Sequence, residues 1–99
     1  MDFEIVMMDP AYDDLDEAIY YYESQSQGLG SRFYQDVLLQ FEKLKVKPQY
    51  YKFYIENFRR ILLDKFPYLV IYKVMEEQVI IYAIVYSGRD PKTISAKIQ

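Results

Sequence analysis

Hydrophobic positions recur with a strand-like or helix-like period along most of the chain, and the order of these patterns predicts the fold. Residues 2–8 form a short apolar-rich segment with apolar side chains at every second position, which is typical of a β-strand. In residues 9–27 and 31–45, apolar side chains recur every three or four positions. This spacing predicts two amphipathic helices after the first strand.

Residues that favour helix ends support both helices. Asp9 is suited to be the N-cap of the first helix, with Pro10 at the first helical position. Gly28 and Gly30 lie in the link between the helices, and Pro48 ends the second one. A link this short predicts an antiparallel helical hairpin.

The second half of the chain predicts strands. Residues 59–65 alternate between faces, and residues 68–75 and 78–86 are rich in Val, Ile and Tyr. Pro67 lies between the first and the second of these strands and separates them. The two acidic residues at 76–77 are the expected turn of a hairpin between the last two strands, although they lack the favoured Asn-Gly chemistry.

These patterns together predict an α+β fold of one domain, residues 1–99, in the order β-α-α-β-β-β. We expect an antiparallel helical hairpin to pack on one face of a mostly antiparallel sheet, and the other face to be partly open. Two segments leave alternatives. Residues 49–57 form a loop or an edge element, and residues 92–99 form a short strand, form a helix or are disordered in the free protein.

Charge is distributed unevenly along the chain. The formal net charge is −3, yet residues 1–26 carry eight acidic side chains and no Lys or Arg. Residues 27–99 carry the 12 basic side chains against seven acidic ones, a local charge of +5. A positive surface can therefore coexist with an acidic total. The early acids of the first helix are expected mainly on its solvent side: Asp13, Asp14, Asp16 and Glu17.

Two residue types are missing, and their absence limits the chemistry. The chain contains no histidine and no cysteine. This excludes a histidine metal site, a Ser-His-Asp triad and a thiol nucleophile, and we predict no metal and no cofactor. No apolar run approaches the roughly 20 residues that span a bilayer, and the acidic N-terminus does not resemble a secretory signal. We expect a cytoplasmic protein that does not enter a membrane.

Arginines near strand ends are the main candidates for function. Arg89 follows the last strand beside Asp90 and can make bidentate contacts with phosphate or carboxylate, or can simply pair with that neighbour in solvent. Arg59 and Arg60 are adjacent on a strand and must point to opposite faces. The 12 tyrosines raise the odds of a protein partner.

The candidate site residues fall into two groups. Arg89 and Arg60 are the candidate catalytic cations. The candidate partner-binding residues are Arg59, Lys65, Tyr68, Tyr72 and Tyr86.

Several of these segments, in this order and spacing, resemble the RelE/ParE superfamily of type II toxin–antitoxin toxins, and most closely its ParE-like, plasmid-stabilisation branch. The matching positions are Ala18, Tyr21, Tyr22, Arg32, Phe33, Leu38, Pro48, Tyr50, Arg60, the run from Phe66 to Tyr72, the strand from Val79 to Tyr86, and Arg89-Asp90-Pro91. The resemblance implies a small bacterial toxin that is neutralised by a cognate antitoxin. It also implies one of two activities, since RelE-like members cleave mRNA on the ribosome and ParE-like members inhibit DNA gyrase.

The departures from the superfamily pattern favour the second activity. Leu69 stands where an arginine is often found, Ser87 where many relatives carry histidine, and Ser95 near the place of a terminal catalytic tyrosine. Arg89 carries over, with Arg60 as a second cation. RNA cleavage needs a base and an acid as well as cations, and an acidic chain is poorly suited to a ribosome. We therefore expect a toxin that binds a protein target, with gyrase as the candidate. A RelE-like endoribonuclease and a binding module without activity are the alternatives.

Overall fold

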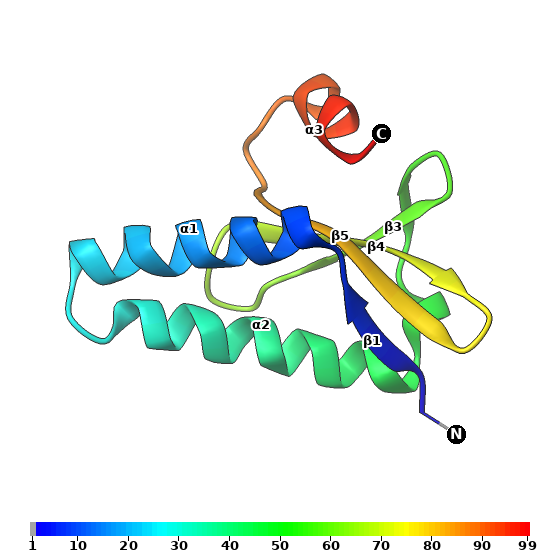
Figure 1. The fold of residues 1–99 in the computed structure, drawn as a ribbon, viewed down its shortest axis with the longest axis horizontal. Coiled ribbons are helices and arrows are strands. Elements are labelled where there is room, and N and C mark those ends of the chain that lie inside the picture. Colours follow the sequence, from blue (N-terminus) through cyan, green and yellow to red (C-terminus); the bar gives the residue numbers. More distant parts are fainter. Residues whose placement is uncertain (1) are drawn as a thin grey trace.

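Residues 2–99, which the computed structural model describes, form a five-stranded sheet and three α-helices (Figure 1). The sheet has the strand order β1-β5-β4-β3-β2. In chain order the elements are β1 (Glu4–Met7), α1 (Asp9–Gln25), α2 (Leu29–Val46), the 3-10 helix η1 (Pro48–Tyr50), β2 (Phe53–Ile55), β3 (Phe58–Leu62), β4 (Tyr68–Met75), β5 (Gln78–Tyr86) and α3 (Pro91–Ile98). The predicted α+β class and element order are confirmed.

The helical hairpin depends on a glycine where the two helices meet. α2 begins at Leu29, two residues before the predicted start, so Gly30 lies inside the helix. A Cβ at Gly30 would lie 2.7 Å from the Ile19 carbonyl oxygen, and glycine therefore lets α1 and α2 approach closely. Gly28 caps α2 with φ of 86°, a left-handed conformation that suits glycine. At the start of α1 the N-cap is Met8 rather than Asp9, which lies in the first turn instead.

The sheet is antiparallel except at one edge. β1 pairs in parallel with β5, from Glu4 opposite Gln78 to Met7 opposite Ile81. β4 and β5 form the predicted hairpin, whose turn places Glu76 at φ of 56°. The β4–β5 register shifts once, because Ile71 lies opposite Ala83 whereas Tyr72 lies opposite Ile81. The extra residue on β5 is Tyr82, which forms a β-bulge. Because of this bulge, the side chains of β5 after Tyr82 point to the faces opposite to those that the alternation before it would give.

One face of the sheet is covered by the helical hairpin, and this is where most of the core lies. Phe33 and Leu44 of α2 are fully buried there, as is Tyr72 of β4. The buried residues of this layer are Ala11, Leu15, Ala18, Phe33, Val37, Phe41, Leu44, Ile61, Leu63, Val70, Tyr72, Val79, Ile81 and Ile84. We call this side the hairpin face.

The opposite face is covered in part by α3, and Leu62 and Met75 of the same face remain 51% and 52% exposed, in line with the expected partly open face. Ile94 and Ile98 of α3 are buried against the sheet. Their partners on the strands are Phe58, Leu69, Ile71, Ala83 and Val85. The tail is therefore a helix, and its two isoleucines lie on one side of it because they are four residues apart. We call this side the α3 face.

The edge of the sheet beyond β3 is short. β2 pairs with β3 at Arg59 and Phe58, which confirms the edge alternative for residues 49–57. β3 ends at Leu62, three residues before the predicted end. Beyond it, the backbone N–H groups of Asp64 and Lys65 donate to the carboxylate of Asp36 on α2. These bonds turn the chain toward the helix and end the strand.

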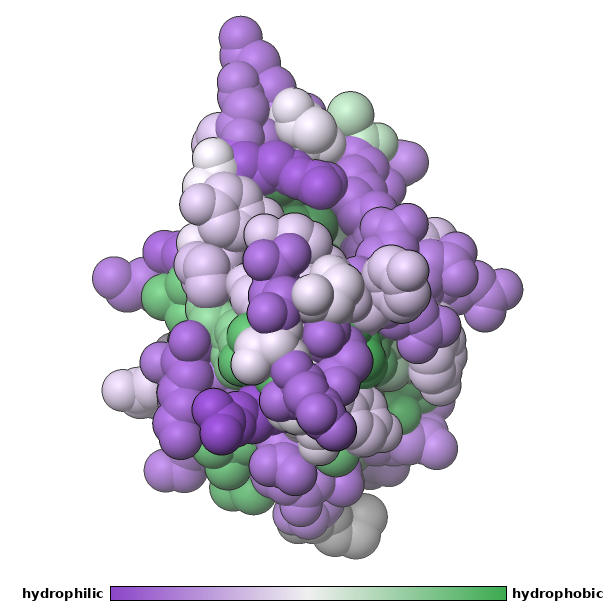
Figure 2. Space-filling model, turned by 90° about the vertical axis from the view of Figure 1, so that its left-hand side faces the viewer, coloured by the Kyte–Doolittle hydropathy of each residue, from purple (hydrophilic) through white to green (hydrophobic). Residues whose placement is uncertain are grey.

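Among residues 2–99, no helix is long and apolar enough to cross a bilayer. Figure 2 shows the end of the molecule at which the α1–α2 turn lies. That surface is largely hydrophilic, with small hydrophobic areas between the polar side chains (Figure 2). At this end the layered core is thus screened from solvent.

Candidate partner-binding surfaces

Arg89 lies on a short loop that is held at both ends. The Ser87 N–H donates to the Pro67 carbonyl oxygen at 2.8 Å, and the Arg89 N–H donates to the Tyr86 carbonyl oxygen at 3.2 Å. After the loop, the Asp90 carboxylate caps α3 by accepting from the Lys92 N–H at 2.8 Å. Asp90 therefore serves the helix, and the exposed Arg89 is presented to solvent on a fixed backbone.

Gly88 lets the Arg89 loop close over a tyrosine. A Cβ at position 88 would lie 2.5 Å from Cε2 of Tyr86 and 3.0 Å from its Cζ. Any other residue would have to displace the Tyr86 ring. The glycine of the Ser-Gly-Arg sequence is thus explained by this approach of the backbone to an aromatic ring.

A cavity of about 230 Å³ lies beside Arg89, between α1 and the end of β5. Tyr68 and Tyr86 form part of its wall, with ring centroids 6.1 Å apart. Tyr68 also packs on Phe33 of the core, with centroids 4.9 Å apart. Burial raises the pKa of the Tyr68 phenol above its usual value, and the charge of Arg89 acts in the opposite direction. We refer to Tyr68, Tyr86 and Arg89 as the Arg89 surface.

Asp14 borders the same cavity and is largely buried, contrary to the expected solvent position of the early acids. One carboxylate oxygen accepts from the Ile84 N–H of β5 at 2.9 Å. The other lies 2.7 Å from the Lys97 ammonium of α3. Asp14 thus joins α1, β5 and α3, beyond the point at which β1 stops pairing with β5.

Arg59 and Arg60 point to opposite faces, as the strand geometry requires. The Arg59 guanidinium donates to the carbonyl oxygens of Gln49 at 3.1 Å and Tyr51 at 2.7 Å. It also lies 3.9 Å from the ring centroid of Phe53. Arg59 therefore fastens the η1–β2 segment to β3. Nη1 is thus engaged within the protein, and a contact of Arg59 with a partner stays a prediction.

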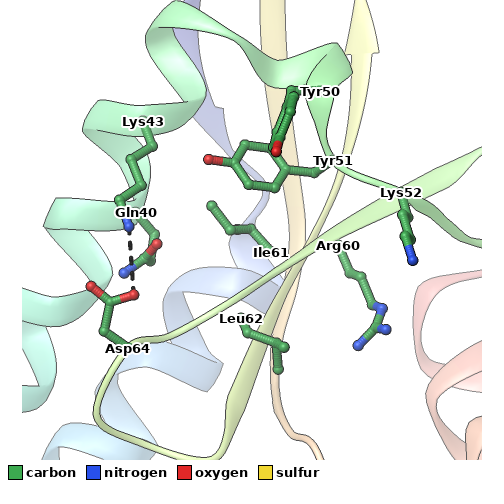
Figure 3. A pocket seen from close by; sticks show the side chains of 9 residues that line it. All are labelled: Gln40, Lys43, Tyr50, Tyr51, Lys52, Arg60, Ile61, Leu62 and Asp64. Carbon is green, nitrogen blue, oxygen red and sulfur yellow. Dashed lines mark hydrogen bonds and ion pairs between the residues drawn. The ribbon is translucent and has the colours of Figure 1, made fainter.

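Arg60 belongs to a different cavity from Arg89. Its side chain is half-buried, with the guanidinium 5.2 Å from the Tyr54 ring centroid. The cavity measures about 460 Å³ and lies between α2, η1 and the outer edge of β3 (Figure 3). It is lined by Gln40, Lys43, Tyr50, Tyr51, Lys52, Arg60, Ile61, Leu62 and Asp64. We call it the β3-edge cavity; β4 separates its strand from β5, so the two candidate catalytic arginines lie apart.

Lys65 lies on the turn after β3, with an exposed side chain and its N–H bonded to Asp36. It borders a third cavity, of about 430 Å³, together with Arg32 and Phe66. Lys65 is accessible to a partner there, and it is not brought together with either Arg60 or Arg89.

Tyr72 does not belong to a partner-binding surface. It is fully buried on the hairpin face, and its hydroxyl donates to the Pro48 carbonyl oxygen at 2.7 Å. Burial raises the pKa of the Tyr72 phenol far above its usual value. The prediction that Tyr72 contacts a partner is therefore corrected: the β4 register turns it toward α2, where it ties η1 to the core.

Sequence reasoning missed two carboxylates that organise the fold. Asp36 is 6% exposed and accepts from Gln40 Nε2 and from the N–H groups of Asp64 and Lys65. Asp36 and Asp14 both fall within the apolar stripe of their helix, at i+3 from Phe33 and Ala11. An acid at such a position must find buried partners, and this was the available signal.

The Arg89 surface suits recognition better than bond cleavage. A tyrosine whose pKa is raised stays protonated at neutral pH, so Tyr68 can donate a hydrogen bond but is a poor base. Arg89 supplies a planar cation beside two aromatic rings, one of them half-exposed. This combination is typical of surfaces that bind a carboxylate and an apolar group of a protein.

Comparison with known proteins agrees with the fold. The order of elements defines a small α+β fold, and a structure described as the chromosomal ParDE TA system from P. aeruginosa superposes with a TM-score of 0.73. The match has 18% identity and covers 85% of this chain and 95% of that one, so it speaks for the fold alone. No curated protein matches the sequence.

The family itself is established by the sequence. Residues 5–91 match the family described as the ParE toxin of the type II toxin-antitoxin system, parDE. The chain therefore belongs to the ParE toxin family, in agreement with the resemblance found in the motifs.

Proposed function

We propose that this ParE-family protein is a toxin that acts by binding a protein target in the cytoplasm, with DNA gyrase as the candidate, and that a cognate antitoxin holds it inactive. Family membership supports the toxin and its antitoxin partner. The observation that carries the mode of action is the Arg89 surface. Its cation is exposed on a fixed loop, and burial raises the pKa of the Tyr68 phenol, which borders the same cavity and is therefore a poor base.

Expression in bacteria tests the proposal. The protein is induced alone, and then together with the product of a neighbouring short open reading frame. Plasmid supercoiling and mRNA integrity are measured in the same cultures. We expect growth arrest with loss of supercoiling, intact mRNA, and recovery when the second protein is present. Rapid mRNA cleavage with normal supercoiling would establish the endoribonuclease instead, and growth without any defect would indicate a binding module without activity.

Arg89→Ala tests the surface, with Lys92→Ala as a matched control because both side chains are exposed cations near the same helix. We expect Arg89→Ala to reduce toxicity at least about tenfold, since arginines at interface centres contribute on the order of 2 kcal/mol. Lys92→Ala should stay toxic. Circular dichroism confirms that both variants are folded. Full toxicity of a folded Arg89→Ala variant contradicts the role of Arg89.

A further inference from the structure

The cavity beside Arg89 has walls of opposite charge. Its lining holds Asp14 and Glu17 of α1 and Arg89 of the loop after β5. Asp14 is already engaged, since it accepts from the Ile84 N–H and lies 2.7 Å from the Lys97 ammonium. Glu17 and Arg89 are exposed, and among residues 2–99 neither takes part in an ion pair. A carboxylate and a guanidinium therefore border the same cavity without pairing with each other.

The charges around the cavity favour a cationic occupant. Two acids and one arginine line it, and residues 1–26 carry eight acids and no Lys or Arg. Burial raises the pKa of the Tyr68 phenol, the charge of Arg89 lowers it, and the charges of Asp14 and Glu17 raise it. Both signs of charge thus act on one phenol of the wall. The excess of acids along α1 attracts a cation and repels a phosphate.

Three tyrosines also line the cavity: Tyr21, Tyr68 and Tyr86. Tyr21 and Tyr86 are 54% and 48% exposed, and the rings of Tyr68 and Tyr86 stand at 72° to each other. The face of a tyrosine ring attracts a cation, and arginine is found there more often than lysine. The rings can also contact the apolar stem of a basic side chain. The aromatic part of the lining therefore suits an arginine.

The size of the cavity matches one side chain. It measures about 230 Å³, whereas sites that enclose a small molecule measure about 300–1,000 Å³. A single long side chain that enters from the surface of a partner is therefore a better match than a free small molecule.

We propose that the cavity beside Arg89 receives a basic side chain, arginine by preference, from a partner protein, and that an acidic side chain next to it on the partner binds Arg89. The basic group lies between the Glu17 carboxylate and the tyrosine rings, and the acidic group makes a bidentate contact with the Arg89 guanidinium. This inference rests on the proposed function, since it takes the Arg89 surface as the place where a protein binds. It adds the chemistry of that protein, which is a pair of opposite charges and not a carboxylate alone.

A pair of opposite charges fits the cavity better than either sign alone. An acidic group that approaches Arg89 alone comes close to the like charge of Glu17, and a basic group alone comes close to the like charge of Arg89. A nucleic acid offers phosphates without a cation and meets the acids of α1. A protein surface with both charges satisfies both walls.

Three dipeptides, acetylated and amidated at their ends, test the cavity on the full chain. They are arginine–aspartate with both charges, arginine–asparagine with the cation only, and glutamine–aspartate with the acid only. Binding is followed by NMR as shifts of the ring signals of Tyr21, Tyr68 and Tyr86. We expect arginine–aspartate to bind about fivefold more tightly than either of the others, because each exposed charge contact adds a factor of this order.

Three results of this titration overturn the proposal. They are equal or absent binding of the three dipeptides, shifts confined to residues outside the cavity, and a short single-stranded RNA that shifts these rings when the dipeptides do not.

Glu17→Gln removes the acid and keeps the size of the side chain. It should weaken binding of arginine–aspartate about fivefold and should not weaken binding of glutamine–aspartate. Asp16→Asn is the matched control, since Asp16 is an exposed acid of the same helix and lies outside the cavity lining. Circular dichroism confirms that both variants are folded. Equal weakening by the two substitutions overturns the proposal, because it would show a general effect of acidic charge and no specific contact of Glu17.

The growth assay separates this inference from the proposed function. The dipeptides are measured on the isolated chain, so a chain that binds them as expected but is not toxic contradicts the proposed function alone. If the chain is toxic, Glu17→Gln should lower toxicity and Asp16→Asn should not. A toxic chain whose Glu17→Gln variant binds arginine–aspartate as tightly as the unchanged protein contradicts this inference alone.

Discussion

The two faces of the sheet are closed in different ways. The hairpin face is covered by two long helices, 17 and 18 residues, whose side chains interlock with β3, β4 and β5. The α3 face is covered by one helix of eight residues, which is connected to β5 by the Arg89 loop and buries two isoleucines. Both cores are apolar, yet they differ in how much structure must separate to open them. We expect the hairpin face to open only when the whole protein unfolds, and the α3 face to open by release of α3.

A matched pair of core substitutions should show this difference, and the hairpin side has the larger effect. Leu44 is fully buried on the hairpin face. Leu44→Ala should lower the free energy of unfolding by about 3 kcal/mol, because the cavity cannot be relieved locally. Urea unfolding measures this loss, and the dependence of the free energy on urea concentration should be the same for the variant and the unchanged protein. A loss under about 1 kcal/mol would mean that the hairpin yields more easily than its packing indicates.

Ile94→Ala is the counterpart on the α3 face, and Ile94 is likewise fully buried. The expected loss is smaller, about 1.5 kcal/mol, because release of α3 limits the cost to the free energy with which that helix docks. Hydrogen exchange should accelerate at the amides of α3 and of the strand residues beneath it. If Ile94→Ala costs as much as Leu44→Ala, the two faces unfold as one unit and the comparison fails.

The hairpin face also predicts a response to alkaline pH. Burial raises the pKa of the Tyr72 phenol above the usual value of about 10. The resulting stability is therefore complete below about pH 10 and is lost as pH rises further, because the unfolded phenol ionises first. Tyr72→Phe should cost about 1 kcal/mol at pH 7 through the lost bond to Pro48, and should reduce the fall in stability between pH 10 and 12.

Thermal unfolding across this pH range, with tyrosinate absorbance, measures the effect. The control is Tyr50→Phe, since Tyr50 is largely exposed. The Tyr72→Phe variant and the unchanged protein could lose stability equally at alkaline pH. This result would show that other tyrosines dominate the alkaline response, such as Tyr22 and Tyr68, whose phenol pKa values are also raised by burial.

The smallest expected effect concerns the ion pair that holds α3. Lys97→Ala removes the partner of Asp14 but leaves the bond from the Ile84 N–H. We expect a loss of about 0.5 kcal/mol in stability and faster exchange at α3 amides. Lys92→Ala, an exposed cation on the same helix, should change neither. Equal exchange in both variants would show that the isoleucines alone hold the helix.

Periodicity predicted the elements well where they are long, and less well where partners are distant in sequence. The helices and the β4–β5 hairpin followed from local spacing of apolar residues. The covering role of α3 did not, because two isoleucines in eight residues make a weak pattern. Asp36 accepts from backbone N–H groups 28 and 29 residues away, and the partners of Asp14 are at least 70 residues away, so no local pattern records these bonds. Tyr72 was assigned to the wrong surface because the alternation along a strand separates its two faces but does not tell which face is buried.

The parallel pairing of β1 with β5 has a consequence for synthesis on the ribosome. Strand β1 is made before its partner residues, 78–81, which follow about 70 positions later. The helical hairpin can form while β1 still has no neighbour. The sheet can be completed only after β5 has been made, so the loop that carries Arg89, which follows β5 directly, does not reach its place before the sheet closes.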